Sequence, residues 1–411
     1  QYVEKIKKMQ IPFYTFKRAL DWTGENLEEI FPERSKIKNM IKKLNFDMIN
    51  PFILRSTEYY ADISEIYKSF PFDIFIADNC FTRIPFVKDK IGVPVIAVGV
   101  LPLTETSKDL APAGLGMTPS TSFFGRRKQD FLRFLADRVL FRKPNQLMRK
   151  LLHQHGIESG NTNIFDLISR KSTLLLQSGT PGFEYKRSDL SSNVRFIGPL
   201  LPYSGKRQAA PWSDCRLGIY KKVVLVTQGT VEKDPEKIIV PVLEAFKDSE
   251  YLVVATTGGS KTKELQNRYP QFNIIIEDFI PFADIMPHAD VYITNGGYGG
   301  VMLGIENQLP MVVAGVHEGK NEINARIGYF KLGVNLGTEK PTPAQMKAAV
   351  EKVMADASYR KNVKELSKEF SKYDPYSLCA SYVASIMKPA VMPGRVSFIN
   401  RKFLKTAIAS N

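Results

Sequence analysis

Short, continuous runs of apolar residues recur along the chain, and charged amphipathic stretches separate them. Eight runs rich in Val, Ile or Leu are bounded by turn residues and cover 72–78, 93–100, 172–178, 222–228, 251–257, 273–278, 291–295 and 310–315. Strands buried on both faces of a parallel sheet have this continuous pattern. Stretches between them, such as 234–248, 342–355 and 358–371, have helical spacing. The alternation predicts an α/β fold with doubly wound parallel sheets.

One interruption of this pattern divides the chain. The segment 203–215 contains Gly and Pro without periodicity, and a new strand–glycine turn–helix unit starts directly after it. Two domains also suit a chain of 411 residues, because single domains usually have about 100–200. We predict a first Rossmann-like domain over 1–203, a linker over 204–215, a second Rossmann-like domain over 216–372, and a C-terminal helix with a basic tail over 373–411.

The composition is that of a folded protein, but the net charge is high. Hydrophobic residues make up 44% and charged residues 24%, which excludes a mainly disordered or fibrous chain. The 57 Lys and Arg residues outnumber the 42 Asp and Glu residues, and a net charge of +15 indicates phosphate-bearing partners. The excess is concentrated in 1–43, 126–150 and 388–411, and the rest of the chain is nearly neutral. We therefore expect no nucleic-acid partner.

The segment 126–150 combines its charge with helical periodicity. It holds nine basic and two acidic residues, and Phe131, Phe134, Leu135 and Val139 follow helical spacing. The pattern predicts either a surface helix with a solvated basic face or a helix that approaches anionic lipid or an anionic acceptor.

The three cysteines, Cys80, Cys215 and Cys379, lie far apart and without metal-ligand spacing. They exclude a disulfide framework or a zinc site of their own and fit a reducing compartment. The sequence has no apolar run of about 18 residues and no signal peptide. We expect a cytoplasmic protein without a transmembrane helix.

Three glycine-bearing turns directly follow predicted strands of the second domain, at the strand ends where open parallel sheets bind ligands. The turn 227–230 is either an anion-binding turn or a plain tight turn. The turn 294–300 (TNGGYGG) places four glycines at a helix start, which predicts a backbone cradle for phosphate. It matches neither the P-loop nor the G-x-G-x-x-G pattern. The turn 315–320 (GVHEGK) is either a sugar-reading loop or a solvated one.

Residues 277–336 carry a resemblance to a known family. The segments that match its motifs are Phe279-Ile280-Pro281-Phe282, Asn295-Gly296-Gly297, Gln308-Leu309-Pro310 and Asn324-Ala325. They resemble the aromatic–x–Pro–Gln, His-x-Gly, Gly-Val-Pro and Asn-Ala motifs of UDP-glucosyl/glucuronosyltransferases, that is, glycosyltransferase family 1 with its bacterial macrolide- and flavonoid-glycosylating members. The resemblance continues more weakly from about residue 70. It implies a GT-B fold, two Rossmann-like doubly wound parallel-sheet domains that face a central cleft.

The resemblance implies an inverting hexosyltransferase that moves a sugar from a UDP-sugar to a hydroxyl of a small acceptor, with no metal and no further cofactor. Phe279 would stack on the base, and Ile280 would bind it through its backbone. The turns 227–230 and 295–300 would hold the pyrophosphate, and Glu318 and Lys320 would face the sugar. The implied donor-binding residues are Thr227, Gln228, Gly229, Thr230, Phe279, Ile280, Asn295, Gly296, Gly297, Gly299, Gly300, Glu318 and Lys320.

The family takes the acceptor proton with a His on the loop after its first strand, which an Asp orients. Asp78 matches that Asp and is the implied catalytic residue. The four histidines, His153, His155, His288 and His317, all lie too far downstream to match the base. We therefore expect that roughly 40 N-terminal residues, with the first strand and the base, are absent from this chain. The long loop 104–125 is expected to shape the acceptor pocket.

Three positions depart from the family pattern. Asn295 replaces a phosphate-facing His, Leu303 replaces a ribose-binding Glu or Gln, and Gly319 stands where an Asp commonly reads the sugar. The missing base and the changes at Asn295 and Leu303 leave open a sugar-nucleotide-binding GT-B protein without transfer. The basic segment 126–150 leaves open a transferase for lipid-linked acceptors in peripheral contact with an anionic membrane, and a GT-B epimerase is a further alternative. The acceptor, the sugar, the nucleotide base and the oligomeric state also stay open.

Overall fold

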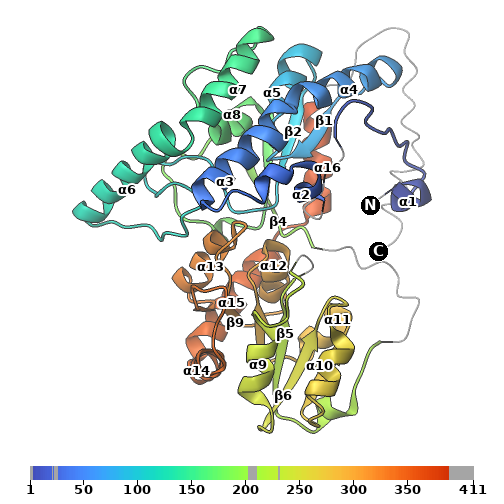
Figure 1. The fold of residues 1–411 in the computed structure, drawn as a ribbon, viewed down its shortest axis with the longest axis vertical. Helices are drawn as coiled ribbons and strands as arrows, with labels where there is room; N and C mark the ends of the chain where they lie inside the picture. Colours follow the sequence, from blue (N-terminus) through green and yellow to red (C-terminus); the bar gives the residue numbers. More distant parts are fainter. Residues whose placement is uncertain (1–2, 21, 23–25, 202–210, 230–231, 388–411) are drawn as a thin grey trace.

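The two predicted sheets form the centres of two lobes in the computed structural model, which describes residues 3–20, 22, 26–201, 211–229 and 232–387 (Figure 1). Every strand pairing recorded between the named strands is parallel. The α/β prediction is confirmed. The sheets lie on either side of the predicted linker, most of which falls outside the described residues, so the domain boundaries themselves stay a prediction.

The first sheet has four strands in the order β1 (Phe75–Asp78), β2 (Val95–Gly99), β3 (Leu174–Ser178) and β4 (Val194–Gly198). Successive side chains of β2 point to opposite faces, so Val95 and Ala97 enter one core while Ile96 enters another. The first core is covered by α4 (Ser56–Ser69), α5 (Ile84–Phe86), α7 (Arg142–Gln154) and α8 (Ile164–Lys171). The remaining helices of this lobe are α1 (Val3–Lys8), α2 (Leu27–Ile30), α3 (Met40–Asp47) and α6 (Phe123–Leu135).

The other face of the first sheet is covered from the far end of the chain. Helix α16 (Pro375–Ile386) packs Leu378, Tyr382 and Ile386 against Ile96 and its neighbours, and Figure 1 shows it in the lobe of the first sheet. The predicted C-terminal helix therefore exists and belongs to the first lobe. Its predicted basic tail, 388–411, lies outside the described residues.

The second sheet has six strands in the order β10 (Gly333–Asn335), β9 (Met311–Val313), β8 (Val291–Thr294), β5 (Lys222–Thr227), β6 (Tyr251–Thr256) and β7 (Ile274–Glu277). One face packs on α9 (Ile239–Phe246), α10 (Thr262–Arg268) and α14 (Pro343–Ala355). The other packs on α11 (Phe282–Ile285), α12 (Tyr298–Glu306), α13 (Lys320–Tyr329) and α15 (Ala357–Phe370). Since β5 is buried on both faces, its continuous apolar run is explained.

Two strands were not expected, β4 and β10. The run VRFIG of β4 is only partly buried, and β10 has three residues, so neither presents a long apolar run. The predicted helix 234–248 is shorter, because α9 begins at Ile239.

The segment 126–150 is helical, but the orientation of its side chains differs from an ordinary surface helix. It forms α6, a π-helical stretch η4 (Ala136–Leu140) and the start of α7. Phe131, Phe134 and Val139 are exposed, whereas Arg133 points inward to the carbonyl of Leu110. Exposed basic side chains such as Arg127 and Lys128 agree with the interpretation of a solvated basic face, but exposed aromatic side chains lie among them. Among the described helices, none is long and apolar enough to cross a membrane.

Candidate active site

The turns at the carboxyl edge of the second sheet meet where the strand order changes direction. From β5 the chain proceeds outward through β6 and β7, and from β8, on the other side of β5, it proceeds through β9 and β10. Ligands of open parallel sheets bind in the crevice at such a switch point. The structure thereby brings the turns that follow β5, β8 and β9, singled out from the sequence, to one edge.

Asn295 joins the two turns that flank the switch point. Its buried Nδ2 donates to the carbonyl of Gln228, and its Oδ1 accepts from the backbone N–H of Gly297 at 3.2 Å. Its own carbonyl accepts from Nδ2 of Asn324 at 3.4 Å. The side chain that was expected to face phosphate thus makes contacts within the chain, and it fixes the backbone of both turns.

Different constraints apply at the glycine positions of the turn 294–300. Gly296 has a φ of +85°, and a Cβ there would overlap the amide of Asn324. A Cβ on Gly300 would lie 3.2 Å from the hydroxyl of Tyr292. By contrast, a Cβ on Gly299 would meet nothing within 4 Å, so space is open beside the first turn of α12. Packing therefore explains Gly296, while open space over the N–H groups of a helix start suits an anion near Gly297 and Gly299.

The turn after β9 is held in shape by a carboxylate that sequence reasoning missed. Glu339 accepts from the backbone N–H groups of Val316 at 2.5 Å and His317 at 2.9 Å. Partial burial opposes ionisation, but these two N–H groups lower the pKa of Glu339 overall. In the sequence, the position of Glu339 shortly after β10 could have pointed to this role, but that strand was itself not expected. In the same turn, Lys320 forms an ion pair of 2.6 Å with the exposed Glu318.

Phe279 presents a free aromatic ring at this edge. It follows β7 and is 73% exposed, whereas its neighbour Ile280 is buried in the core and anchors the turn.

Sequence reasoning overlooked the turn after β6, where Gly258 and Gly259 both have positive φ. A Cβ on Gly258 would lie 3.9 Å from the carbonyl of Gly229. A Gly-Gly pair directly after a buried strand was the signal for it.

The turn 227–230 offers fewer accessible side chains to a ligand than expected. Thr227 and Gln228 are buried, and Gln228 Nε2 donates to the carbonyl of Asp234 at 2.9 Å. Gly229 has a φ of +80° and is exposed, while Thr230 lies outside the described residues. Leu303, at the position of the family's ribose ligand, packs against the core.

Asp78 ends β1 at the carboxyl edge of the first sheet. Its side chain is exposed, and its Oδ1 accepts from the N–H of Cys80 at 2.7 Å. The histidines lie elsewhere in the fold: His153 and His155 at the end of α7, His288 in the 3₁₀ turn Met286–His288, and His317 in the turn after β9. In the described residues, no cluster of three or more His, Cys, Asp or Glu side chains could hold a metal ion.

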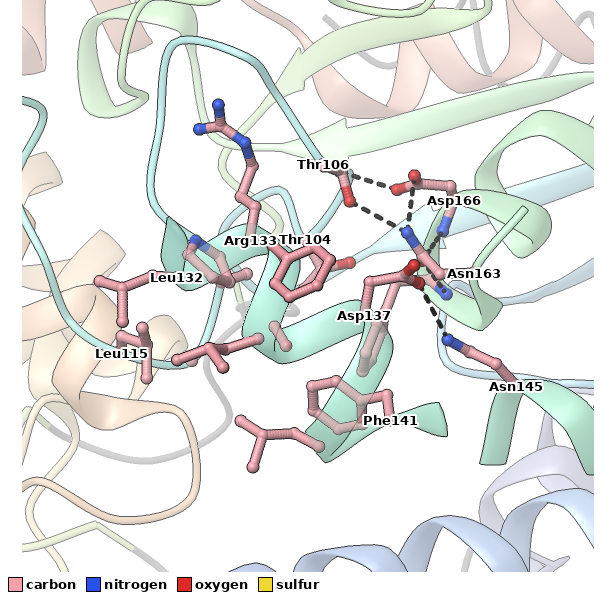
Figure 2. Close-up of a pocket in the computed structure, with 18 of the residues that line it drawn as sticks. Thr104, Thr106, Leu115, Leu132, Arg133, Asp137, Phe141, Asn145, Asn163 and Asp166 are labelled. Atoms are coloured by element: carbon pink, nitrogen blue, oxygen red, sulfur yellow. Dashed lines mark hydrogen bonds between the residues drawn. The ribbon is translucent and has the colours of Figure 1, made fainter. Parts of the chain in front are cut away.

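A cavity of about 970 Å³ lies in the first lobe (Figure 2). Its walls come from the segment after β2, from α6 and η4, and from the start of α8; they include Leu101, Thr104, Leu115, Leu132, Phe134, Leu135 and Phe141. One side is polar, because Asp166 accepts from the backbone N–H of Thr106 at 2.7 Å and from Asn163 Nδ2 at 2.8 Å. The cavity can therefore take a largely apolar molecule with a few polar groups. The expectation that the loop 104–125 shapes a pocket agrees with its walls.

The cavity and the edge of the second sheet share the start of α13. Gly319 and Glu322 line the cavity, directly beside the Glu318–Lys320 pair. Glu322 Oε1 accepts from the N–H groups of Gly114 at 2.9 Å and Gly116 at 2.7 Å. One short segment of the second domain therefore holds a wall of the cavity and forms part of the turn after β9.

A buried ion pair fixes the two lobes to each other. Arg326 of α13 and Glu184 of the first lobe are 2.8 Å apart, with 1% and 5% of their side chains exposed. Burial opposes the charge of Arg326, but Glu184 outweighs it and raises the pKa of the guanidinium. Tyr298 adds a bond of 2.7 Å from its hydroxyl to the carbonyl of Ser178. Both sites therefore depend on contacts that cross between the domains.

Comparison with known proteins gives consistent matches over most of the chain. Residues 81–387 match the family model "UDP-glucoronosyl and UDP-glucosyl transferase". The chain is 32% identical over 358 residues to 4'-demethylrebeccamycin synthase of Lentzea aerocolonigenes, an alignment that covers 87% of this chain and 83% of that protein. It is 30% identical over 390 residues to UDP-glycosyltransferase 2 of Phaeomoniella chlamydospora, with 90% and 84% covered.

A solved structure has the same fold. The glycosyltransferase of kitacinnamycin superposes with a TM-score of 0.71 at 16% identity, and the alignment covers 94% of this chain and 89% of that one. This likeness establishes the two-domain GT-B architecture that the sequence resemblance implied.

Proposed function

Because this chain belongs to the UDP-glucuronosyl and UDP-glucosyl transferase family, whose members transfer sugars from nucleotide donors, we propose that it transfers a hexose from a UDP-sugar to a hydroxyl of a small, mostly apolar acceptor with inversion. The observation that carries the proposal is the adjacency of two unlike sites. A glycine-lined sheet edge and an apolar cavity of about 970 Å³ meet at the start of α13.

The donor lies along the edge of the second sheet in this proposal. The diphosphate binds at the start of α12, where N–H groups are free of intrahelical partners and the helix dipole favours negative charge. Phe279 stacks on the base, and the Glu318–Lys320 pair faces the sugar. The same N–H groups stabilise the charge that grows on UDP as the bond to the anomeric carbon breaks.

The acceptor lies in the cavity with its hydroxyl toward the donor. Its oxygen bonds to the anomeric carbon from the side opposite to UDP, UDP departs with the bonding electrons, and the hydroxyl proton goes to a base. Asp78, at the carboxyl edge of the first sheet, positions or assists that base. No metal ion takes part, so turnover is expected to survive EDTA.

The donor assignment is tested by calorimetric titration with UDP. Gly299→Trp fills the open space beside α12 and should weaken UDP binding at least about tenfold. Gly218→Trp is the matched control, because a Cβ there also meets nothing within 4 Å, and it should bind UDP normally. Equal binding by both variants would contradict the site.

Transfer is tested by UDP release from UDP-sugars with hydroxylated aromatic acceptors. Release above the rate with water supports transfer, and Asp78→Asn should lower kcat more than it raises KM. UDP binding without acceptor-dependent release in the wild type would instead favour a sugar-nucleotide-binding protein or a chain without the catalytic base.

A further inference from the structure

Helix α6 turns a row of aromatic side chains to solvent. Phe123, Phe124, Phe131 and Phe134 are between 58% and 83% exposed. Phe123, Arg127, Phe131 and Phe134 follow one another at steps of four, four and three residues, so they lie on one face of the helix. We call these four residues the α6 face.

The side of α6 that packs on the protein carries polar side chains beside Leu132 and Leu135. Gln129 is 2% exposed, and its amide N and O have no hydrogen-bond partner among the described residues. Arg133 points inward, to the carbonyl of Leu110 and to Asp130. Buried polar side chains on one side and exposed aromatic rings on the other depart from the order of an ordinary surface helix, and packing within the described residues does not explain the α6 face.

Cations surround the α6 face. Within the described residues, the exposed side chains of Arg126, Arg127, Lys128, Arg142 and Lys143 make no ion pair. The segment's two carboxylates pair instead with Arg133 and Arg138. The guanidinium of Arg127 lies 5.4 Å from the ring of Phe123. Aromatic rings interleaved with cations are typical of helices that lie in the interface of an anionic bilayer.

A groove lined by arginines lies beside the face. Its volume is about 490 Å³, and three arginines outnumber one carboxylate in its lining, which comprises Phe134, Asp137, Arg138, Arg142, Asn145, Gln146 and Arg149. It shares Phe134 and Arg138 with the lining of the large cavity. Guanidinium groups bind phosphate oxygens well, so the groove suits lipid headgroups immediately beside the apolar cavity.

We propose that the α6 face docks this protein on an anionic lipid bilayer. The three aromatic rings of the α6 face and the ring of Phe124 enter the boundary between headgroups and acyl chains, and the surrounding cations and the arginine groove bind headgroup phosphates. A second copy of this chain is a poorer occupant, because two such faces would bring like charges together. As an extension that rests on the proposed function, the acceptor enters the cavity from the membrane, since Leu132, Phe134 and Leu135 of α6 line its wall.

Flotation with lipid vesicles tests the docking. The wild type should float with vesicles of phosphatidylcholine and phosphatidylglycerol, far less with phosphatidylcholine alone, and be released by high salt. Combined Phe123→Ser, Phe124→Ser and Phe131→Ser should lower the partition coefficient at least about tenfold. These three residues do not line the cavity, so UDP binding should be unchanged.

Two matched controls test whether vesicle binding depends on the position of the aromatic rings and cations on α6 or only on exposed aromatic surface and net charge in general. Phe272→Ser removes an aromatic ring that is 61% exposed on the other lobe and should leave flotation unchanged. Neutralising Arg126, Arg127 and Lys128 to Gln should release the protein from vesicles. Neutralising the exposed Lys263, Lys347 and Lys361 to Gln removes the same net charge and should not.

Each outcome separates docking from the proposed function. A wild type that floats but does not bind UDP would overturn the proposed function and leave docking intact. One that binds UDP but does not float with anionic vesicles overturns the docking. Loss of a dimer in the triple Phe variant, without any vesicle binding by the wild type, would assign the face to a second copy instead.

Discussion

Under the proposed function, the two halves of the site would recognise their ligands by different means. The edge of the second sheet is formed mainly by backbone: glycines at positive φ, the start of α12, and buried amides such as Asn295 that hold the turns. The cavity of the first lobe is formed by side chains, mostly apolar, from segments far apart in the chain. Backbone N–H groups suit a diphosphate, while apolar side chains suit a mostly apolar acceptor.

This difference predicts which changes disturb one site, the other or both. The changes below run from the largest expected effect to the smallest.

Arg326→Met should disturb both sites, because it leaves Glu184 buried between the lobes without its cation. Breaking a buried pair costs about 3–5 kcal/mol of unfolding free energy, which urea denaturation would measure. Replacing Glu184 by Met as well should restore part of that loss, since the buried carboxylate is then gone and only Glu322 has lost its partner Arg326. A single variant as stable as the wild type would show that the pair does not hold the lobes together.

Gly296→Ala should disturb only the carboxyl edge of the second sheet, where the donor is proposed to bind, and leave the cavity intact. The added methyl group meets the Asn324 amide at a φ that disfavours Ala, so the turn must move. We expect UDP affinity to fall about a hundredfold or more, equivalent to roughly 2.7 kcal/mol. Gly218→Ala is the control and should bind UDP within about twofold of the wild type, because its Cβ meets open space away from this edge. Equal effects at both glycines would contradict the packing role of Gly296.

Leu115→Trp should disturb the cavity alone. Leu115 lines the cavity and is partly exposed, so a larger ring reduces the space without overpacking the core. The KM for an apolar acceptor should rise about tenfold, while UDP affinity stays the same. Leu190→Trp, at an exposed position of the same lobe outside the cavity lining, should change neither. A matching loss of UDP affinity in the Leu115 variant would mean that the two sites are not separable.

The smallest effect is expected for Glu339, which holds the turn after β9 and should make the free energy of unfolding depend on pH. The pKa of Glu339 is lowered in the folded chain, so its ionised form adds stability at pH values above the unfolded value of 4.5. This contribution is lost as the pH falls through the lower, folded pKa. Glu339→Gln should flatten that part of the profile of unfolding free energy, and an unchanged profile would contradict the role of the carboxylate.

The fold was largely predictable because its strongest signals are local. The runs KVVLVT and YLVVAT can be satisfied only by burial on both faces, and they became β5 and β6. By contrast, β10 has three residues and lies at an edge of the sheet, so its sequence had no apolar run to detect. The glycine turns could be recognised for the same local reason. The role of Glu339 could not, because it depends on contacts with residues more than 20 positions away.

Helix α6 shows the limit of periodicity as evidence. The spacing of Phe131 and Phe134 predicts a helix with an apolar face, and the helix exists. Which way that face points is not encoded in the spacing. Contacts of Arg133 with Leu110 and the burial of Gln129 turn the aromatic side outward, and they depend on how the loop before α6 folds beneath it.

The sequence alone determined two parallel-sheet domains, the family resemblance and the glycine-bearing turns of the donor edge, because each follows from residues close together in the chain. The tertiary structure decided the cavity, the Arg326–Glu184 pair and the outward direction of the α6 face. Each of these joins segments far apart in sequence; the ion pair alone links residues 142 positions apart. Such contacts depend on how the lobes pack, and no local pattern of hydrophobic and polar residues records that packing.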